Sequence, residues 1–163
     1  MDFLIEKADN LNVHSSTITE LLHNVYVGEN YVNPDAAEKL FDATSLLNRG
    51  IIICAVEKQS LTLAGCVIVV SSNSPACKIA KEKESEMHLL CVSIKYRNNG
   101  LGKLLINSAI DMAIHNGNIK MILWTQQSMK TAQRLYSSLD FVHVKNITKN
   151  NRKFLVYEKN LNS

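Results

Sequence analysis

One segment, residues 87–115, constrains the fold of this chain more than any other. Residues 87–94 are mostly apolar, with apolar side chains on both alternating faces, which is typical of a central strand covered on both sides. Residues 97–102 then form a turn with two asparagines and two glycines, and residues 101–115 carry apolar side chains at intervals of three and four. A buried strand, a glycine turn and an amphipathic helix in this order predict a mixed α/β fold.

The same patterns predict the elements on either side of this segment. The order is β-α-α-β-β-β-α-β-α-β-β, with Ser15 or Ser16 capping the first helix and Pro34 beginning the second, which is expected to end near Asn48. A polar loop over residues 71–85 is expected to be solvated. The remaining strands are expected at 3–8, 51–57, 63–70, 119–124, 141–147 and 152–159, and the last helix at 129–139.

Composition limits the classes of protein that need to be considered. A chain of 163 residues with 46% hydrophobic side chains predicts one domain over residues 1–163. The net charge of +3 arises from basic and acidic residues spread along the chain, so no nucleic acid is expected. Without a long apolar run or a signal peptide, we expect a cytoplasmic protein with no membrane contact. The four cysteines lack metal-ligand spacing, so no metal is expected.

The turn at residues 97–102 is a candidate phosphate site. Glycine and asparagine tolerate unusual φ angles, and a turn into a helix directs backbone N–H groups toward an anion. By itself, however, Gly100-Leu101-Gly102 is more typical of an ordinary chain reversal. Neither a Walker A loop nor a dinucleotide-binding Gly-x-Gly-x-x-Gly pattern is present.

Together with its neighbours, this turn resembles the acyl-CoA signature of the GCN5-related N-acetyltransferase (GNAT) superfamily. That signature is Arg/Gln-x-x-Gly-x-Gly/Ala after a strand that carries a valine, which is Val92 here. A second family element, an alanine four residues before a tyrosine and a following phenylalanine, is matched by Ala132, Tyr136 and Phe141. The chain departs from the family at Met129, where asparagine is frequent, and at Asp140, where glycine is frequent.

The resemblance implies a GNAT-like fold and acetyl-CoA as the cofactor. By similarity, the backbone of Leu90 and Val92 pairs with the pantetheine arm, and the thioester oxygen lies near the amides of Leu90 and Cys91. Tyr136 is the implied general acid, which protonates the departing thiolate. The other residues implied to contact the cofactor are Arg97, Asn98, Asn99, Gly100, Leu101, Gly102, Lys103 and Ala132.

An amine is protonated at neutral pH, so the reaction needs a base or a water chain. Period-two alternation would put Glu86, His88, Leu90 and Val92 on one face of the same strand. Glu86 is therefore the first candidate for the base, and His88 is the alternative base or relay. Each of them could instead be a hydrogen-bonded structural group.

The acceptor side is less well determined by the sequence. The family resemblance implies that Tyr26, Glu29 and Tyr31 contact the substrate together with Glu86, and that homodimers are frequent. The expected function is acetyl transfer to a primary amine of a small molecule, amino acid or peptide by direct attack in a ternary complex. The alternative is a catalytically silent acyl-CoA-binding module. A basic group around Lys149 and Arg152 is given no role.

Overall fold

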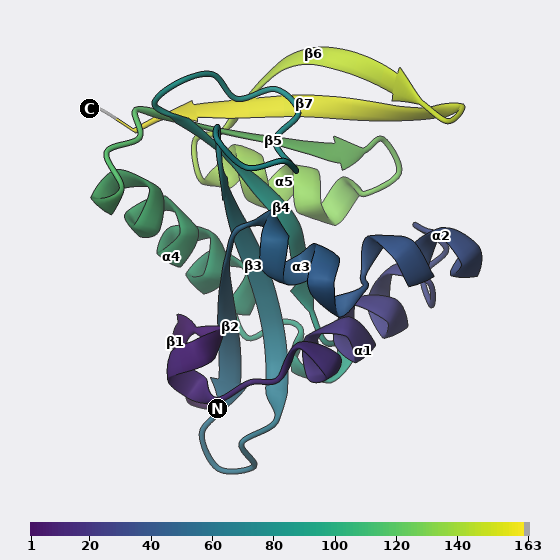
Figure 1. The fold of residues 1–163 in the computed structure, drawn as a ribbon, viewed down its shortest axis with the longest axis vertical. Coiled ribbons are helices and arrows are strands. Elements are labelled where there is room, and N and C mark those ends of the chain that lie inside the picture. Colours follow the sequence, from purple (N-terminus) through teal and green to yellow (C-terminus); the bar gives the residue numbers. More distant parts are fainter. Residues whose placement is uncertain (162–163) are drawn as a thin grey trace.

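The fold is a mixed sheet of seven strands with helices on both faces (Figure 1). The structure is a computed structural model that describes residues 1–161, so the last two residues of the predicted domain lie outside the described part. The strands are β1 Phe3–Lys7, β2 Ile51–Glu57, β3 Leu63–Ser71, β4 Glu84–Val92, β5 Lys120–Gln126, β6 Val142–Lys149 and β7 Arg152–Asn160. The helices are α1 Ser15–Tyr26, α2 Pro34–Leu40, α3 Ala43–Arg49, α4 Leu101–His115 and α5 Lys130–Ser138, with 3-10 turns η1 Ala8–Leu11 and η2 Ile94–Tyr96. The predicted mixed α/β class is confirmed.

The strands are arranged in the order β1-β2-β3-β4-β5-β7-β6. Adjacent strands are antiparallel except for β4 and β5, which are parallel and are connected through α4. The β6–β7 hairpin closes through Asn150 and Asn151, whose φ angles of 52° and 62° are in the left-handed region that asparagine tolerates. Parallel pairing in the middle of the sheet requires the long crossover that α4 provides.

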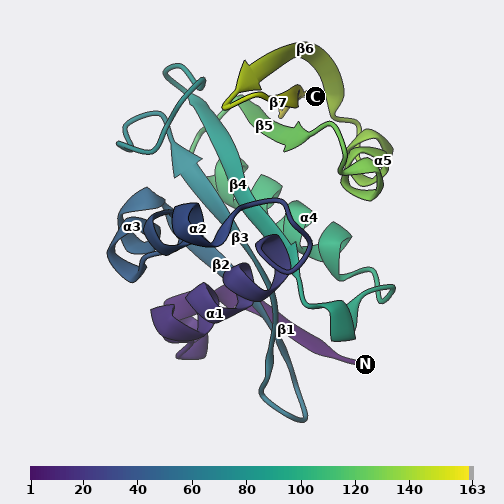
Figure 2. The same cartoon turned by 90° about the vertical axis from the view of Figure 1, so that its right-hand side faces the viewer.

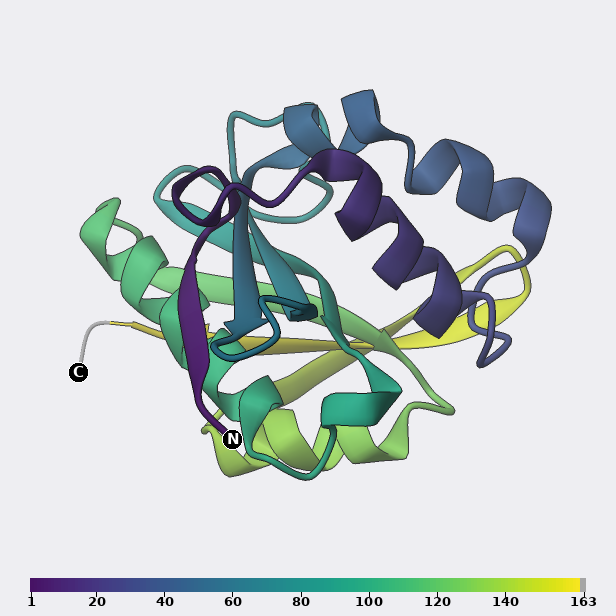
Figure 3. The ribbon, with the colours of Figure 1, turned by 90° about the horizontal axis from the view of Figure 1, so that it is seen from below.

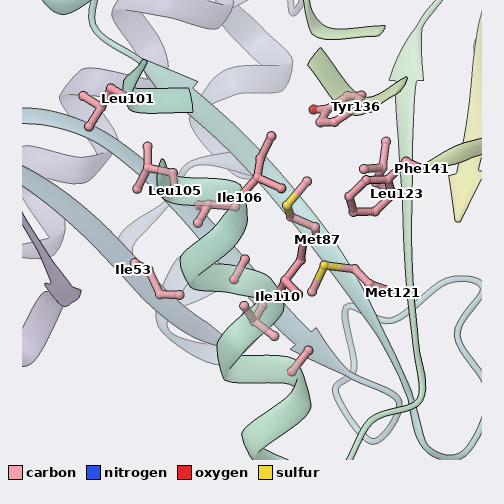
Figure 4. Packing of buried hydrophobic residues seen from close by; sticks show 14 of the residues in the cluster. Ile53, Met87, Leu101, Leu105, Ile106, Ile110, Met121, Leu123, Tyr136 and Phe141 are labelled. Atoms are coloured by element: carbon pink, nitrogen blue, oxygen red, sulfur yellow. The ribbon is translucent and has the colours of Figure 1, made fainter. Parts of the chain in front are cut away.

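Two apolar clusters cover the two faces of the sheet. Figure 2 shows α1, α2 and α3 on one face and α4 and α5 on the other. On the α4 face, Leu105, Ile106 and Ile110 pack over the strands, close to Met87 and Met121 (Figure 4). On the other face, side chains of α1 to α3 pack against alternate residues of β2 and β3. The predicted central strands are therefore covered on both sides, which explains their nearly continuous apolar sequence.

The predicted second helix is two helices, α2 and α3, separated at Phe41 and Asp42. The Asp42 side chain accepts a hydrogen bond from the Ser45 N–H at 3.2 Å and caps a new helix. Phe41 is fully buried where the chain changes direction. The apolar spacing continued across this break, so the prediction of one helix was wrong because a local cap outweighed the periodicity.

A β-bulge in β4 changes which side chains share a face. Cys91 is opposite Cys66 and His88 is opposite Ile68, so Leu89 and Leu90 together face Val67 alone. Leu89 adopts a φ of 54°, and the alternation of side chains reverses there. Residues 86 and 88 therefore lie on the α1–α3 face, whereas Leu90 and Val92 pack with the α4–α5 cluster. The prediction that all four share one face was wrong.

Strands β4 and β5 diverge soon after they meet. Their parallel pairing comprises Glu84 with Lys120, Ser85 with Met121 and Glu86 with Ile122. Beyond these pairs β5 continues along β7, while β4 continues along β3. Figure 1 shows the consequence, because β5, β7 and β6 run across the top of the molecule, whereas β2, β3 and β4 run down from them in a different direction. The two halves of the sheet open between the ends of β4 and β5.

Candidate active site

A cavity of about 900 Å³ lies where β4 and β5 have separated. The predicted residues that line it are Tyr26, Tyr31, His88, Leu90, Ala132 and Tyr136. Glu29, Glu86, Cys91, Val92 and residues 97–103 do not line it. A second cavity of about 790 Å³ lies near the C-terminal end of α4 and contains none of the predicted site residues. The cavity between β4 and β5 is therefore the candidate active site.

Tyr136 reaches this cavity from α5. Its ring is 6% exposed and packs against Phe141 and Tyr157, with ring centroids 6.0 and 6.1 Å away. Figure 4 shows its hydroxyl pointing away from Phe141 and Leu123. Burial raises the pKa of Tyr136 above its ordinary value, so the phenol keeps its proton at neutral pH. A neutral hydroxyl held by rigid packing is suited to donate a proton.

The turn at residues 97–102 has the backbone geometry of an anion site. Asn98 and Gly100 have φ angles of 64° and 73°, as the sequence led us to expect. The Asn99 side chain donates to the carbonyl of Tyr96 at 3.1 Å and thereby braces the turn. Gly102 allows α4 to approach α5, because a Cβ there would lie 3.0 Å from Leu135 Cδ2.

The first N–H groups of α4 follow directly from this turn. The N–H groups of Leu101, Gly102 and Lys103 have no carbonyl partner within a helix that begins at Leu101. They point out of the helix end that carries the positive pole of the helix dipole. Strained asparagine and glycine backbone, an open helix end and an exposed Lys103 fit a pyrophosphate group.

Arg97 and Glu29 form a bidentate ion pair with N···O distances of 2.7 and 3.1 Å. Arg97 Nε also donates to the Val92 carbonyl at 3.2 Å, so this side chain joins the end of β4 to the segment after α1. Glu29 was predicted to contact the substrate, but its carboxylate is held by Arg97 outside the cavity. The pair connects the loop after α1 to the candidate pyrophosphate turn.

Tyr26 connects α1 to the bulged part of β4. Its hydroxyl donates to the Leu90 carbonyl at 2.9 Å, and burial raises its pKa well above the ordinary value. Its ring packs against Tyr31 and Phe41 at centroid distances of 6.3 and 5.6 Å. Tyr26 therefore forms a wall of the cavity and fixes the backbone of Leu90, which the family resemblance assigns to the cofactor arm.

The Glu86 carboxylate is fully buried and does not reach the cavity. Its Oε2 accepts hydrogen bonds from the backbone N–H groups of Lys78 (2.9 Å), Ile79 (2.5 Å) and Ala80 (2.8 Å) and from the Cys77 thiol (3.3 Å). Although burial raises its pKa, the hydrogen bonds from His88 and the backbone outweigh burial and lower the pKa of Glu86 to about 2. The loop expected to be solvated is thus folded inward at these residues.

Glu86 holds His88 in one orientation. His88 Nε2 is 2.7 Å from Glu86 Oε1, and its Nδ1 is 2.9 Å from Arg49 Nη1. Because arginine has only donors, Nδ1 accepts and Nε2 donates, which defines a neutral imidazole. Burial lowers the pKa of His88, and the Arg49 charge acts in the same direction against the Glu86 hydrogen bond. His88 faces the cavity and packs edge-on against Trp124, with ring centroids 4.9 Å apart.

The buried position of Cys91 makes its thiol unreactive. It is 3% exposed, packs with the α1–α3 cluster, and burial raises its pKa to about 12. A thiolate is needed for nucleophilic attack, so this environment disfavours covalent catalysis. Only the backbone amide of Cys91 was expected to contact the cofactor, and that role stays a prediction.

Several cavity residues were missed or only partly recognised from the sequence. Arg49 ends α3 and Trp124 lies on β5, and neither matches a motif. Met129, which replaces a frequent asparagine, stands at the N-cap of α5 and provides no side-chain cap. Lys149 and Arg152 line the cavity from β6 and β7, although their basic group was given no role. Only this last group carried a sequence signal, a local excess of positive charge.

Comparison with known proteins identifies the family. A profile described as the acetyltransferase (GNAT) family matches residues 16–141. An uncharacterized N-acetyltransferase of Methanocaldococcus jannaschii is 30% identical over 92 residues, which are 56% of this chain and 38% of that protein. The chain therefore spans less than half the length of this relative.

Solved structures share the fold. An acetyltransferase of the GNAT family from Staphylococcus aureus Mu50 is 19% identical with a TM-score of 0.75, covering 98% of this chain and 99% of that one. PaiA N-acetyltransferase from Thermoplasma acidophilum, solved in complex with coenzyme A, is 18% identical with a TM-score of 0.73 over 98% and 99%.

The chain belongs to the GNAT acetyltransferase family, as its two motifs predict. Acyl-CoA-dependent N-acetyltransferase is the class that this family and fold define, and acetyl-CoA is the cofactor of that class. Within residues 1–161, no helix is both long and apolar enough to cross a bilayer.

The hydrogen bonds of Glu86 predict how stability depends on pH. Because the folded-state pKa is depressed from 4.5 to about 2, the contribution of Glu86 is complete above pH 4.5 and is lost as pH falls toward 2. We expect Glu86→Gln to reduce the free energy of unfolding by about 3 kcal/mol at pH 7. The difference from the original chain should shrink at pH 3 in urea titrations. Glu84→Gln, whose ion pair with Lys120 is 3.8 Å long, is the control and should cost about 1 kcal/mol or less.

Proposed function

We propose that this chain transfers the acetyl group of acetyl-CoA directly to a primary amine bound between β4 and β5. The observation that carries the proposal is that Tyr136 and His88, a protonated phenol and a neutral imidazole, line the same cavity. Such a pair can release one proton and accept another at neutral pH. A buried Cys91 with a raised pKa favours direct attack over a covalent enzyme intermediate.

The cofactor would be held by backbone groups along β4 and α4. The turn from Asn98 to Gly102 and the first N–H groups of α4 would bind the pyrophosphate. Where β4 has separated from β5, its edge near Leu90 is available to an extended pantetheine arm. When bound, acetyl-CoA supplies an acetyl thioester that an amine can attack.

Tyr136 is proposed as the general acid. Its hydroxyl opens into the cavity, while Phe141 and Tyr157 hold its ring from behind. The raised pKa keeps the proton on the phenol until a stronger base, such as a departing thiolate, forms beside it. Ala132, one turn earlier on α5, also lines the cavity and leaves space beside the tyrosine.

His88 is proposed as the base, with Glu86 as the residue that positions it. The nitrogen that can take the amine proton is Nδ1, because Nε2 is bonded to Glu86. The Glu86 carboxylate would stabilise the imidazolium that forms, through the 2.7 Å contact. Arg49 holds Nδ1 in the structure, so its guanidinium must shift before the proton is transferred.

The contact between Arg49 and His88 also supports a second candidate function. If Arg49 remained on Nδ1 with substrate bound, the base would stay blocked and the chain would bind acyl-CoA without turnover. A thiol-release assay with acetyl-CoA across a panel of primary amines, run beside a thermal-shift titration with CoA, separates the two. Stabilisation with turnover supports the enzyme, and stabilisation without turnover supports the silent module.

Pyrophosphate binding by the turn can be tested by substituting the glycines at the two ends of α4. Gly100 and Gly117 have φ angles of 73° and 82° and open space where a Cβ would lie, so glutamate causes similar strain at both. We expect Gly100→Glu to abolish the thermal shift with CoA because its carboxylate repels the pyrophosphate. Gly117→Glu should lower the melting temperature of the free protein but keep the shift. An equal loss of the CoA shift in both variants would contradict the pyrophosphate assignment.

Tyr136→Phe should lower kcat by about tenfold to a thousandfold while leaving the CoA thermal shift unchanged, because only the proton donor is lost. The measurement is steady-state thiol release. Tyr157→Phe removes a hydroxyl from the neighbouring buried ring, which does not line the cavity, and should keep full activity. Unchanged turnover in Tyr136→Phe would remove Tyr136 from this role.

The pH profile of kcat/KM tests whether His88 is the base. Its folded-state pKa lies below 6.5 because burial favours the neutral ring, so activity should fall only as pH drops below that value. His88→Gln should lower kcat/KM by about a hundredfold and lose this acidic limb. Profiles of the same shape in both proteins would show that another group, or water, is the base.

A further inference from the structure

We infer that the acceptor amine also carries an anionic group, a carboxylate or a phosphate, and this inference rests on the proposed function. The cavity between β4 and β5 is lined by several cationic side chains and by no aspartate or glutamate. These cations are Lys39, Arg49, Lys78, Lys149 and Arg152. A cavity walled by one sign of charge concentrates ligands of the opposite sign.

These charges are not neutralised by the protein itself. Among residues 1–161, none of the five forms an ion pair with a carboxylate. Arg152 instead donates to neutral oxygens, the Tyr31 carbonyl and the Gln126 side chain. Glu86 is connected to Arg49 through His88, and its oxygens are already occupied by His88 and by backbone N–H groups.

Arg49 is partly buried at the end of α3. Its Nη1 donates to His88, and its Nε is buried without a hydrogen-bond partner. Burial lowers the pKa of Arg49, which reflects the cost of a charge removed from water. A partly buried guanidinium without a carboxylate partner can bind an external anion through two parallel hydrogen bonds. A ligand of this kind would also draw Arg49 away from His88 Nδ1.

The position of these cations favours the acceptor over the cofactor. Lys149 and Arg152 stand at the tip of the β6–β7 hairpin, and Arg152 is bonded to Tyr31 of the loop between α1 and α2. Lys39 lies on α2 and Arg49 ends α3, both on the α1–α3 face of the sheet (Figure 3). The candidate pyrophosphate turn, residues 97–102, does not line this cavity.

The test compares short primary amines that differ in the charge of the distal group. β-Alanine carries a carboxylate, phosphoethanolamine a phosphate, propylamine no charge and diaminopropane a second cation. We expect kcat/KM for one of the anionic amines to exceed that for propylamine by about tenfold or more. Diaminopropane should be the poorest acceptor. The ratio of the carboxylate to the phosphate amine identifies which anion is preferred.

Three single variants test which cationic side chains cause the preference for an anionic amine. Lys149→Gln and Arg152→Gln should each raise KM for the anionic amine about three- to tenfold, and Lys149→Gln should leave KM for propylamine and acetyl-CoA unchanged. Lys153→Gln removes the same charge from a neighbouring exposed residue outside the cavity and is the matched control. Because Lys149 is exposed and Arg152 also braces the Tyr31 loop, the lysine variant tests charge without loss of a structural contact.

The outcomes separate this inference from the function on which it rests. Turnover of propylamine or diaminopropane as efficient as that of the anionic amines would overturn the inference and leave the acetyltransferase proposal intact. A rise in KM for acetyl-CoA in Lys149→Gln would also overturn it, because the cations would then serve the cofactor. Absence of turnover with every amine would reject the proposed function and this inference together.

Discussion

The separation of β4 from β5 is the constraint on which the rest of the site depends. Two parallel strands in the middle of a sheet would ordinarily pair along their length, yet here the register ends at Glu86 and Ile122. The bulge at Leu89 turns the remainder of β4 away, and β5 follows β7 instead. The space between them receives Tyr136 from α5 and His88 from β4, so the two residues that we propose as acid and base meet there from distant parts of the sequence.

A buried carboxylate organises one wall of this space. Glu86 cannot remain ionised in an apolar interior without full hydrogen bonding, and segment 77–80 folds over it to provide the donors. The same carboxylate fixes the tautomer of His88. The acidic residue that the sequence favoured as the base therefore lies behind His88, and the histidine lines the cavity in which we propose that the amine binds.

Much of the fold could be predicted because its signals are local. The apolar run before the glycine turn, the spacing in α4 and the Asn-rich hairpin each specify an element from neighbouring residues. The family motifs likewise identified the turn, Ala132 and Tyr136. The break between α2 and α3 was missed because helical spacing continued through it, although Asp42 offered a cap. Arg49 and Trp124 gave no signal, because their role arises only from contacts with residues distant in sequence.

The sequence by itself determined the class of fold, the family and the donor half of the reaction, since backbone conformation at Asn98 and Gly100 depends on residue type. Tertiary structure decided which side chains line the cavity that we propose for the acceptor. One extra residue in β4 reversed the expected alternation, which placed Leu90 and Val92 on the face opposite Glu86 and His88. Folding also brought Lys149 and Arg152 to the cavity that contains Arg49. Charge around a cavity depends on distances in space, which a linear pattern does not contain.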